Sequence, residues 1–194
     1  KKNDILKIIS SYDEINIFSI NFQDIYKEIN NNTWVKKGSI EIIYPDTIKV
    51  YLIEKEPVAI WQDKFGNKLI SKDGDFILEK KLNYFKNFLP IIIGKNAHTN
   101  IDPIFKILNL NKDFAKNVWS LTFVNERRWD VHFKQGLTIL LPRVKMKEAW
   151  KKILSLNENF KILNIGLTEL DLRKPNQILG KINIDKKLIF EKRH

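Results

Sequence analysis

Apolar and polar side chains alternate on both sides of a turn in residues 33–61. The apolar positions of the two segments are Ile40, Ile42, Tyr44, Ile48, Val50 and Leu52. Alternation with a period of two predicts paired strands that bury one face. Pro45 and Asp46 supply the reversal between the strands, because proline fixes φ at the first central position of a turn. Pro57 ends the second strand or confines it to a sheet edge.

Two helices are predicted before this hairpin. Their apolar residues recur at helical spacing and are Ile5, Ile8, Ile9 and Tyr12 in the first helix, and Phe22, Ile25, Tyr26 and Ile29 in the second. Asn21 is a plausible N-cap of the second helix, which we expect to span residues 21–30. Two helices on a two-stranded hairpin form a marginal core, so we expect the first helix or the following domain to cover much of it.

Beyond Pro57 the pattern becomes rich in short β segments. We expect strands at residues 58–61, 69–71, 76–78, 89–94, 118–124, 129–133, 137–141 and 170–173, and a strand edge at 162–165. Asp102 followed by Pro103 predicts the start of a helix, and apolar residues at helical spacing predict another over 145–156. The predicted fold class is therefore α+β.

Composition narrows the choice of function only slightly. The chain has 194 residues, 43% of them hydrophobic, which is enough for one or two domains, and it has no cysteine for disulfides or thiolate chemistry. Its formal net charge of +11 fits an anionic partner. The lysines are spread along the whole chain, however, so heavy general use of lysine explains the charge better than a dedicated binding site for a polyanion. No apolar run is long enough to cross a bilayer. The chain does not begin with Met, so we expect a fragment with room for a membrane anchor upstream of Lys1.

Candidate catalytic and metal-binding residues are sparse. His98, His132 and His194 lack zinc-type spacing, and His132 alternates with apolar neighbours as a histidine on a strand face does. Glu54 and Glu56 lie two apart, where a solvated strand face explains them better than an acid–base pair. The chain has no glycine-rich phosphate loop and no nucleophile elbow, so no local motif predicts catalysis, a metal or a cofactor.

Two segments mix cations with aromatic rings, namely residues 127–129 and residues 145–152 around Trp150. A nucleic-acid stacking platform has such a composition, and the second segment also fits a helix on a membrane surface. Trp129 and Trp150 occupy core positions of their elements, so we interpret both rings as core and the cations as a solvated flank.

The segment 170–173 is predicted to be the last strand, followed by a polar, basic tail. An open last strand can accept a strand of another protein by β-augmentation. An edge that is simply protected by Arg173, Lys174 and Pro175 is the alternative, and the residues alone leave both open.

Three segments, in order, resemble the FtsQ/DivIB family of bacterial division proteins. They are residues 34–61, with Trp34-Val35, Tyr44-Pro45-Asp46-Thr47-Ile48 and Glu56-Pro57-Val58-Ala59-x-Trp61; Arg127-Arg128-Trp129 with Gly136 and Leu141; and Leu170-Asp171-Leu172-Arg173. The resemblance implies a POTRA domain over residues 1–56, with its first strand missing. It also implies a mixed, largely antiparallel β domain with packed helices over residues 57–194, ending in a basic, flexible tail.

For function, the resemblance implies a non-enzymatic divisome scaffold without cofactor or metal. Such a protein sits on the periplasmic side of the inner membrane, anchored by one transmembrane helix that this fragment lacks. It would recruit FtsB- and FtsL-like partners and link early and late division proteins for septum formation.

The resemblance also implies that the FtsB-like partner extends the sheet at the C-terminal strand. The partner-binding residues carried over are Leu172, Arg173, Lys174, Pro175, Asn176 and Ile178. No aromatic residue follows Arg173, and Pro175 removes a backbone donor, so this chain departs from the family's pattern there.

Two other functions remain as alternatives. A POTRA-containing protein-translocation or outer-membrane assembly module would use the hairpin edge at residues 40–44. A basic nucleic-acid-binding protein would use the net positive charge.

Overall fold

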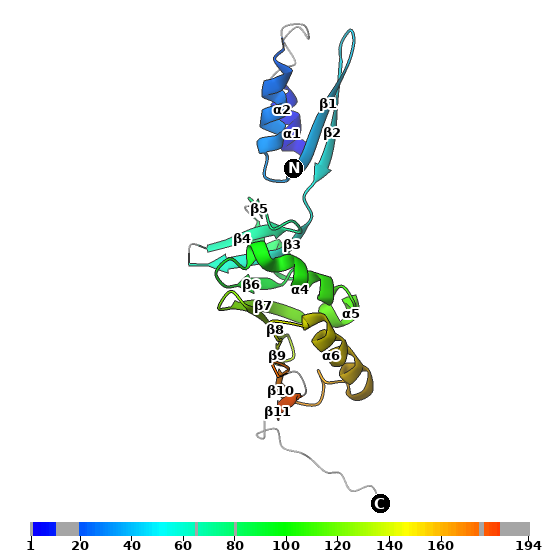
Figure 1. Cartoon of the computed structure of the whole chain (residues 1–194). Helices are drawn as coiled ribbons and strands as arrows, with labels where there is room; N and C mark the ends of the chain where they lie inside the picture. Colours follow the sequence, from blue (N-terminus) through cyan, green and yellow to red (C-terminus); the bar gives the residue numbers. More distant parts are fainter. Residues whose placement is uncertain (1, 11–19, 65, 80, 175–176, 183–194) are drawn as a thin grey trace, which may run out of the picture.

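The computed structural model describes residues 2–10, 20–64, 66–79, 81–174 and 177–182. Two sheets follow one another along the chain, a two-stranded sheet and a nine-stranded sheet (Figure 1). Both carry helices, which confirms the predicted α+β class. Among the helices of the described residues, none has the length and apolar character needed to span a membrane.

The N-terminal unit consists of α1 (Lys2–Ser10), α2 (Phe22–Asn31), β1 (Val35–Ile43) and β2 (Thr47–Glu54). The Asn21 side chain accepts a hydrogen bond from the Gln23 backbone N–H at 3.1 Å, so the predicted cap of the second helix is confirmed. Ile25 and Ile29 of this helix are fully buried with Ile5 and Val35. Tyr12, expected at the end of the first helix, lies outside the described residues.

The large sheet has the order β11-β10-β9-β8-β7-β6-β3-β4-β5. Its strands are β3 (Pro57–Asp63), β4 (Gly66–Ser71), β5 (Phe76–Ile77), β6 (Ile91–Ile93), β7 (Val118–Val124), β8 (Arg128–Phe133), β9 (Thr138–Leu140), β10 (Leu167–Asp171) and β11 (Leu179–Ile182). The pairs β3–β6, β6–β7 and β9–β10 are parallel, and the other neighbours are antiparallel. The sheet is therefore mixed and largely antiparallel, as predicted.

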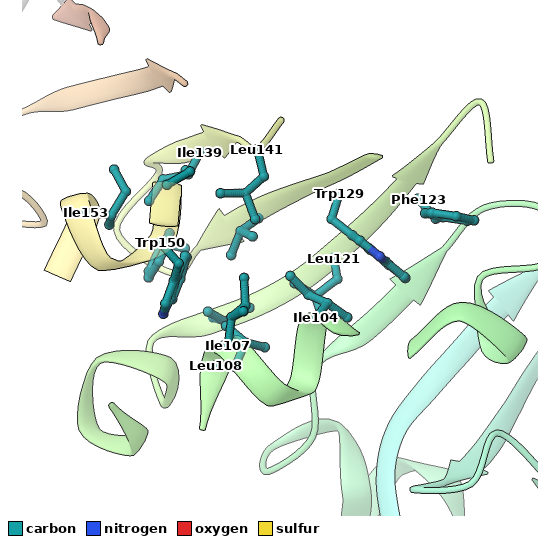
Figure 2. Packing of buried hydrophobic residues seen from close by; sticks show 14 of the residues in the cluster. Ile104, Ile107, Leu108, Leu121, Phe123, Trp129, Ile139, Leu141, Trp150 and Ile153 are labelled. Atoms are coloured by element: carbon teal, nitrogen blue, oxygen red, sulfur yellow. The ribbon is translucent and has the colours of Figure 1, made fainter. Parts of the chain in front are cut away.

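Helices α4 (Ile101–Leu108) and α6 (Met146–Phe160) cover one face of this sheet (Figure 1), while α3 (Leu82–Lys86), the short 3-10 helix η2 (His98–Asn100) and α5 (Lys112–Ala115) lie in its connections. Apolar side chains of α4 and α6 meet those of β7, β8 and β9 in one core (Figure 2). Trp129 and Trp150 are 3% and 0% exposed there, which confirms that both rings belong to the core.

The predicted strand edge at residues 162–165 is wrong, because these residues form a turn before β10. Lys161 and Gly166 flank the turn with φ of 51° and 77°, and the Asn164 N–H donates to the Lys161 carbonyl at 2.8 Å. Left-handed residues at both ends reverse the chain, which an extended strand cannot do.

The prediction that segment 170–173 is the last, open strand is also wrong. The chain's own tail returns as β11 and pairs antiparallel with β10, with Asp171 opposite Leu179 and Leu170 opposite Gly180. The tail that we expected to be flexible therefore supplies a strand at Leu179–Ile182, and its remainder from residue 183 lies outside the described residues. The edge of the sheet is therefore β11 and not the predicted strand at residues 170–173.

Trp34 joins the two sheets. Its ring is 7% exposed and belongs to a cluster with Ile60, Leu69 and Ile77 of the large sheet, and its Nε1 donates to the Leu78 carbonyl at 3.1 Å. Two ion pairs flank this contact, Lys36–Asp73 at 2.6 Å and Lys55–Asp75 at 3.1 Å. A tryptophan from the N-terminal unit thus completes a core of the large-sheet unit.

Candidate partner-binding edge

β11 forms one outer edge of the large sheet, because β10 covers only one of its sides. All four of its residues are exposed, with 53% exposure for Leu179 and 63% for Ile182. At the opposite edge β5 has only two residues, which limits pairing there. Of the two edges of the large sheet, β11 is therefore the more extensive place for an added strand.

The two sides of β11 carry different backbone groups. The Lys181 carbonyl accepts a hydrogen bond from Thr168 Oγ1 of β10 at 3.3 Å, so the backbone groups of Lys181 face β10. Because successive strand residues direct their N–H and C=O groups to opposite sides, those of Gly180 and Ile182 face outward. Within the described chain no strand pairs with this outer side.

The predicted partner-binding residues lie next to this edge rather than on it. Leu172 is 4% exposed, and its N–H already donates to the Leu140 carbonyl at 3.0 Å. Arg173 and Lys174 are exposed in the connection to β11, and Ile178 is 39% exposed just before it. Pro175 and Asn176 lie outside the described residues.

A groove of about 480 Å³ separates this connection from the start of α6. Its lining residues are Pro142, Val144, Lys145, Glu148, Ala149, Lys152, Leu172, Arg173, Lys174, Gln177 and Ile178. Apolar side chains form much of the surface, and the lining also holds four cations and the carboxylate of Glu148, with Arg173 paired to Asp171 outside the lining. We call this the α6 groove; its chemistry suits an acidic segment that carries apolar side chains.

Arg173 is held in place by Asp171. Its Nε and Nη2 donate to the two carboxylate oxygens at 2.9 and 2.7 Å, and its backbone N–H donates to Oδ1 at 2.9 Å. These side-chain hydrogen bonds lower the pKa of Asp171 below its ordinary value. The guanidinium of Arg173, a residue that lines the groove, therefore has a fixed orientation.

A second arginine–aspartate pair lies on β8, two strands away. Arg128 Nε is 3.4 Å from Asp130 Oδ1, and neither atom makes a hydrogen bond within the described residues. Burial raises the pKa of Asp130, while Arg128 opposes that shift. Arg173 also acts electrostatically on Asp130. The two arginine–aspartate pairs are therefore close enough to influence each other, on the sheet face opposite the helices.

Sequence reasoning missed three cations near the site: Arg128 on β8, which acts electrostatically on Asp171, and Lys145 and Lys152, which line the α6 groove. The alternation around Trp129 was the available signal for Arg128, because a buried ring turns the adjacent side chain to the other face. Arg128 is not the solvated flank that we predicted, since its side chain is 27% exposed. Lys152 lies in α6 and Lys145 is the N-cap residue of that helix, which only the fold brings beside residues 172–178.

The other candidates occupy unrelated places. His132 on β8 lies between two threonine hydroxyls, with Nε2 3.0 Å from Thr122 Oγ1 and Nδ1 3.1 Å from Thr138 Oγ1. It is a strand-face histidine, as predicted. Glu54 and Glu56 are both exposed. Across the described ranges, no three His, Cys, Asp or Glu residues gather as metal ligands would.

Family models match nearly the whole described chain. The model described as "Cell division protein FtsQ/DivIB, C-terminal" matches residues 59–173, and the model described as "POTRA domain, FtsQ-type" matches residues 1–55.

Curated relatives agree with these matches. The chain is 31% identical over 173 residues to the cell division protein FtsQ of Rickettsia bellii, and 27% identical over 175 residues to that of Caulobacter vibrioides. These matches cover 89% and 90% of this chain but only 64% and 58% of the two relatives.

A solved structure, the major extracytoplasmic domain of the trans isomer of DivIB from Geobacillus stearothermophilus, aligns with a TM-score of 0.42 at 11% identity. That alignment covers 57% of this chain and 97% of the DivIB chain.

Proposed function

Because this chain belongs to the FtsQ/DivIB family of cell division proteins, we propose that it is a non-enzymatic scaffold that takes up a partner's strand on the outer side of β11. The partner is an FtsB-like division protein, with an FtsL-like protein in the same complex. Through them the scaffold links early and late division proteins during septum formation.

The open edge of β11 is the observation that carries this proposal. Its four residues are exposed, and the backbone groups of Gly180 and Ile182 face outward without a partner strand in the described chain. An added antiparallel or parallel strand would satisfy these groups and bury Leu179 or Ile182. The predicted mode of binding therefore stays as proposed, but the pairing strand is Leu179–Ile182 instead of residues 170–173.

Side chains beside the edge supply specificity. Arg173 and Lys174 stand at the α6 groove together with Lys145 and Lys152, and Arg128 adds a half-buried cation on the sheet face. An acidic partner segment would leave the edge of β11 and enter this groove. Association would then be faster at low salt, because the charges of the two surfaces attract.

The domain assignment follows the same proposal. Residues 1–56 act as the POTRA domain and residues 57–194 as the β domain, with Trp34 fixing one against the other. We propose that the whole protein is held by a single membrane-spanning helix and exposes this part on the periplasmic side of the inner membrane. The FtsQ-type POTRA match favours this role over an outer-membrane assembly module or a nucleic-acid-binding protein.

Two substitutions at Gly180 test the proposal. Gly180→Pro removes the outward N–H, whereas Gly180→Ala keeps it, and a Cβ at this position meets only ordinary contacts with Leu167 and Leu170 at 3.4 and 3.5 Å. Titration of the purified extracytoplasmic segment of the FtsB-like protein should weaken about tenfold for the proline variant and remain near wild type for the alanine variant.

Charge reversal tests the groove separately. Arg173→Glu should weaken binding about tenfold or more and flatten its salt dependence, while Lys151→Glu on the exposed side of α6 serves as the matched control. Equal binding by Gly180→Pro and Gly180→Ala would exclude the β11 edge, even if Arg173→Glu has an effect.

A further inference from the structure

A second groove lies where three parallel strands of the large sheet begin. β3 starts at Pro57, β6 follows Pro90, and β7 starts at Val118, and α4 and α5 close the opposite side. The cavity is about 720 Å³, the size of sites that hold small ligands or several side chains of a peptide. We call it the strand-start groove. It is lined by Glu56, Pro57, Val58, Lys72, Phe88, Leu89, Pro90, Asp102, Phe105, Lys106, Leu108, Asn109, Lys112, Ala115, Lys116 and Val118.

Apolar residues make up about half of the lining of the strand-start groove. Two of them, Pro57 and Pro90, lack a backbone N–H, so they offer no donor at the starts of β3 and β6. Phe88 lines the groove with 70% of its surface exposed, and its ring centroid is 5.5 Å from that of Tyr84, which lies outside the lining and is 67% exposed. Two large aromatic side chains exposed side by side next to a groove are typical of an interaction site.

The lining of the groove holds more cations than carboxylates. Its four lysines are Lys72, Lys106, Lys112 and Lys116, and its two carboxylates are those of Glu56 and Asp102. Asp102 already pairs with Lys106 at 2.6 Å, and Lys116 pairs with Asp113 at 2.7 Å, each pair being well exposed. Lys112 forms no ion pair with the described part of the chain, so the lining has cationic charge available for a ligand.

We propose that the strand-start groove docks an acidic peptide segment of a partner protein. One large apolar side chain of the segment packs against Phe88, Phe105 and the two prolines of the lining, and flanking carboxylates face its lysines. A groove with aromatic side chains in its lining suits a peptide better than the flat surface of a bilayer. β3 lies near the opposite end of the strand order from β11, so this docking does not depend on the proposed strand addition.

The test uses the 194-residue chain and a fluorescein-labelled 12-residue probe with a central Phe-Leu pair flanked by Asp and Glu. Comparison probes carry Ser-Ser in place of Phe-Leu, or Lys and Arg in place of the acids, and phosphatidylglycerol vesicles represent a lipid surface. The acidic apolar probe should bind at least about tenfold more tightly than either altered peptide, and its affinity should fall as salt rises.

Matched variants localise the binding. Lys112→Glu with Lys116→Glu should weaken the probe about tenfold, whereas Lys147→Glu with Lys151→Glu, an equally spaced exposed pair on α6, should leave it unchanged. Phe88→Ser, at an exposed position, should weaken it without loss of fold by circular dichroism.

Three results overturn the proposal: equal binding of acidic and basic probes, binding of the vesicles but not of the probe, or equal effects of the two charge-reversal pairs. If Lys112→Glu with Lys116→Glu fails to fold, the Phe88→Ser variant decides alone. Loss of FtsB-like binding in Gly180→Pro with normal probe binding would separate this site from the β11 edge.

Discussion

Replacing Trp34 by alanine should destabilise the large-sheet unit, although Trp34 belongs to the N-terminal unit. The side chain is 7% exposed among Ile60, Leu69 and Ile77, and its ring centroid is 6.2 Å from that of Phe85. A buried tryptophan removes about 200 Å² from water, worth about 5 kcal/mol at most, and truncations of this kind cost about 3–5 kcal/mol. We expect Trp34→Ala to fall within that range.

The conservative variant separates packing from hydrogen bonding. Trp34→Phe keeps an aromatic ring in the cluster but loses the Nε1 donor to the Leu78 carbonyl. Leu78 is 68% exposed, so water can replace the donor, and we expect a loss of only about 1–2 kcal/mol including the smaller ring. Of the two flanking ion pairs, Lys36–Asp73 is half-exposed and adds little, while Lys55–Asp75 joins a largely buried lysine to a half-exposed carboxylate.

Urea unfolding followed by tryptophan fluorescence measures the effect. The chain has five tryptophans, and the four that remain in the variant all lie beyond residue 56. Their signal therefore reports the large-sheet unit alone. An unchanged fluorescence midpoint in Trp34→Ala, with normal signal amplitude, would refute the idea that this ring completes the core of the other unit.

Three further outcomes are expected. Gly94→Ala should lose more than about 2 kcal/mol in urea unfolding, because Gly94 has φ of 127° and a Cβ there would lie 2.5 Å from the Phe123 carbonyl oxygen. Burial lowers the pKa of His98 and His132 below 6.5, so their contribution to stability is present above pH 6.5 and is lost as pH falls through the folded pKa values. Thermal melts should therefore fall on acidification from about pH 7 to 5, and less so in a variant with both histidines changed to Gln. Trp150→Phe should cost less than about 2 kcal/mol by urea unfolding, because it also removes a buried Nε1 donor that has no hydrogen-bond partner among the described residues.

Local signals in the sequence predicted the N-terminal unit well. The Asn21 cap and the stripe of Ile25 and Ile29 define α2 without help from the rest of the fold, because capping and helical spacing act within one element. The hairpin of β1 and β2 was predicted for the same reason, from apolar positions at a period of two on both sides of residues 45–46, although Tyr44 and Leu52 at those positions are exposed.

β11 could not be predicted from its residues. All four are exposed, so the strand has no buried face to produce an alternating pattern, and Gly180 lowers its intrinsic strand preference. It forms because β10 offers an edge for pairing, which is a property of the whole sheet. The α6 groove has the same origin: Lys145 and Arg173 lie 28 positions apart and share one hollow only after α6 packs on the sheet.

Residue-resolved hydrogen exchange of β11, with and without the FtsB-like partner, tests the central claim most directly. In the free protein Lys181 should be protected by β10, while Gly180 and Ile182 should exchange quickly. Addition of the partner should protect Gly180 and Ile182 and leave Lys181 as it was, because an added strand reaches only the outward groups. Full binding of the partner with rapid exchange still seen at both Gly180 and Ile182 would contradict strand addition at this edge.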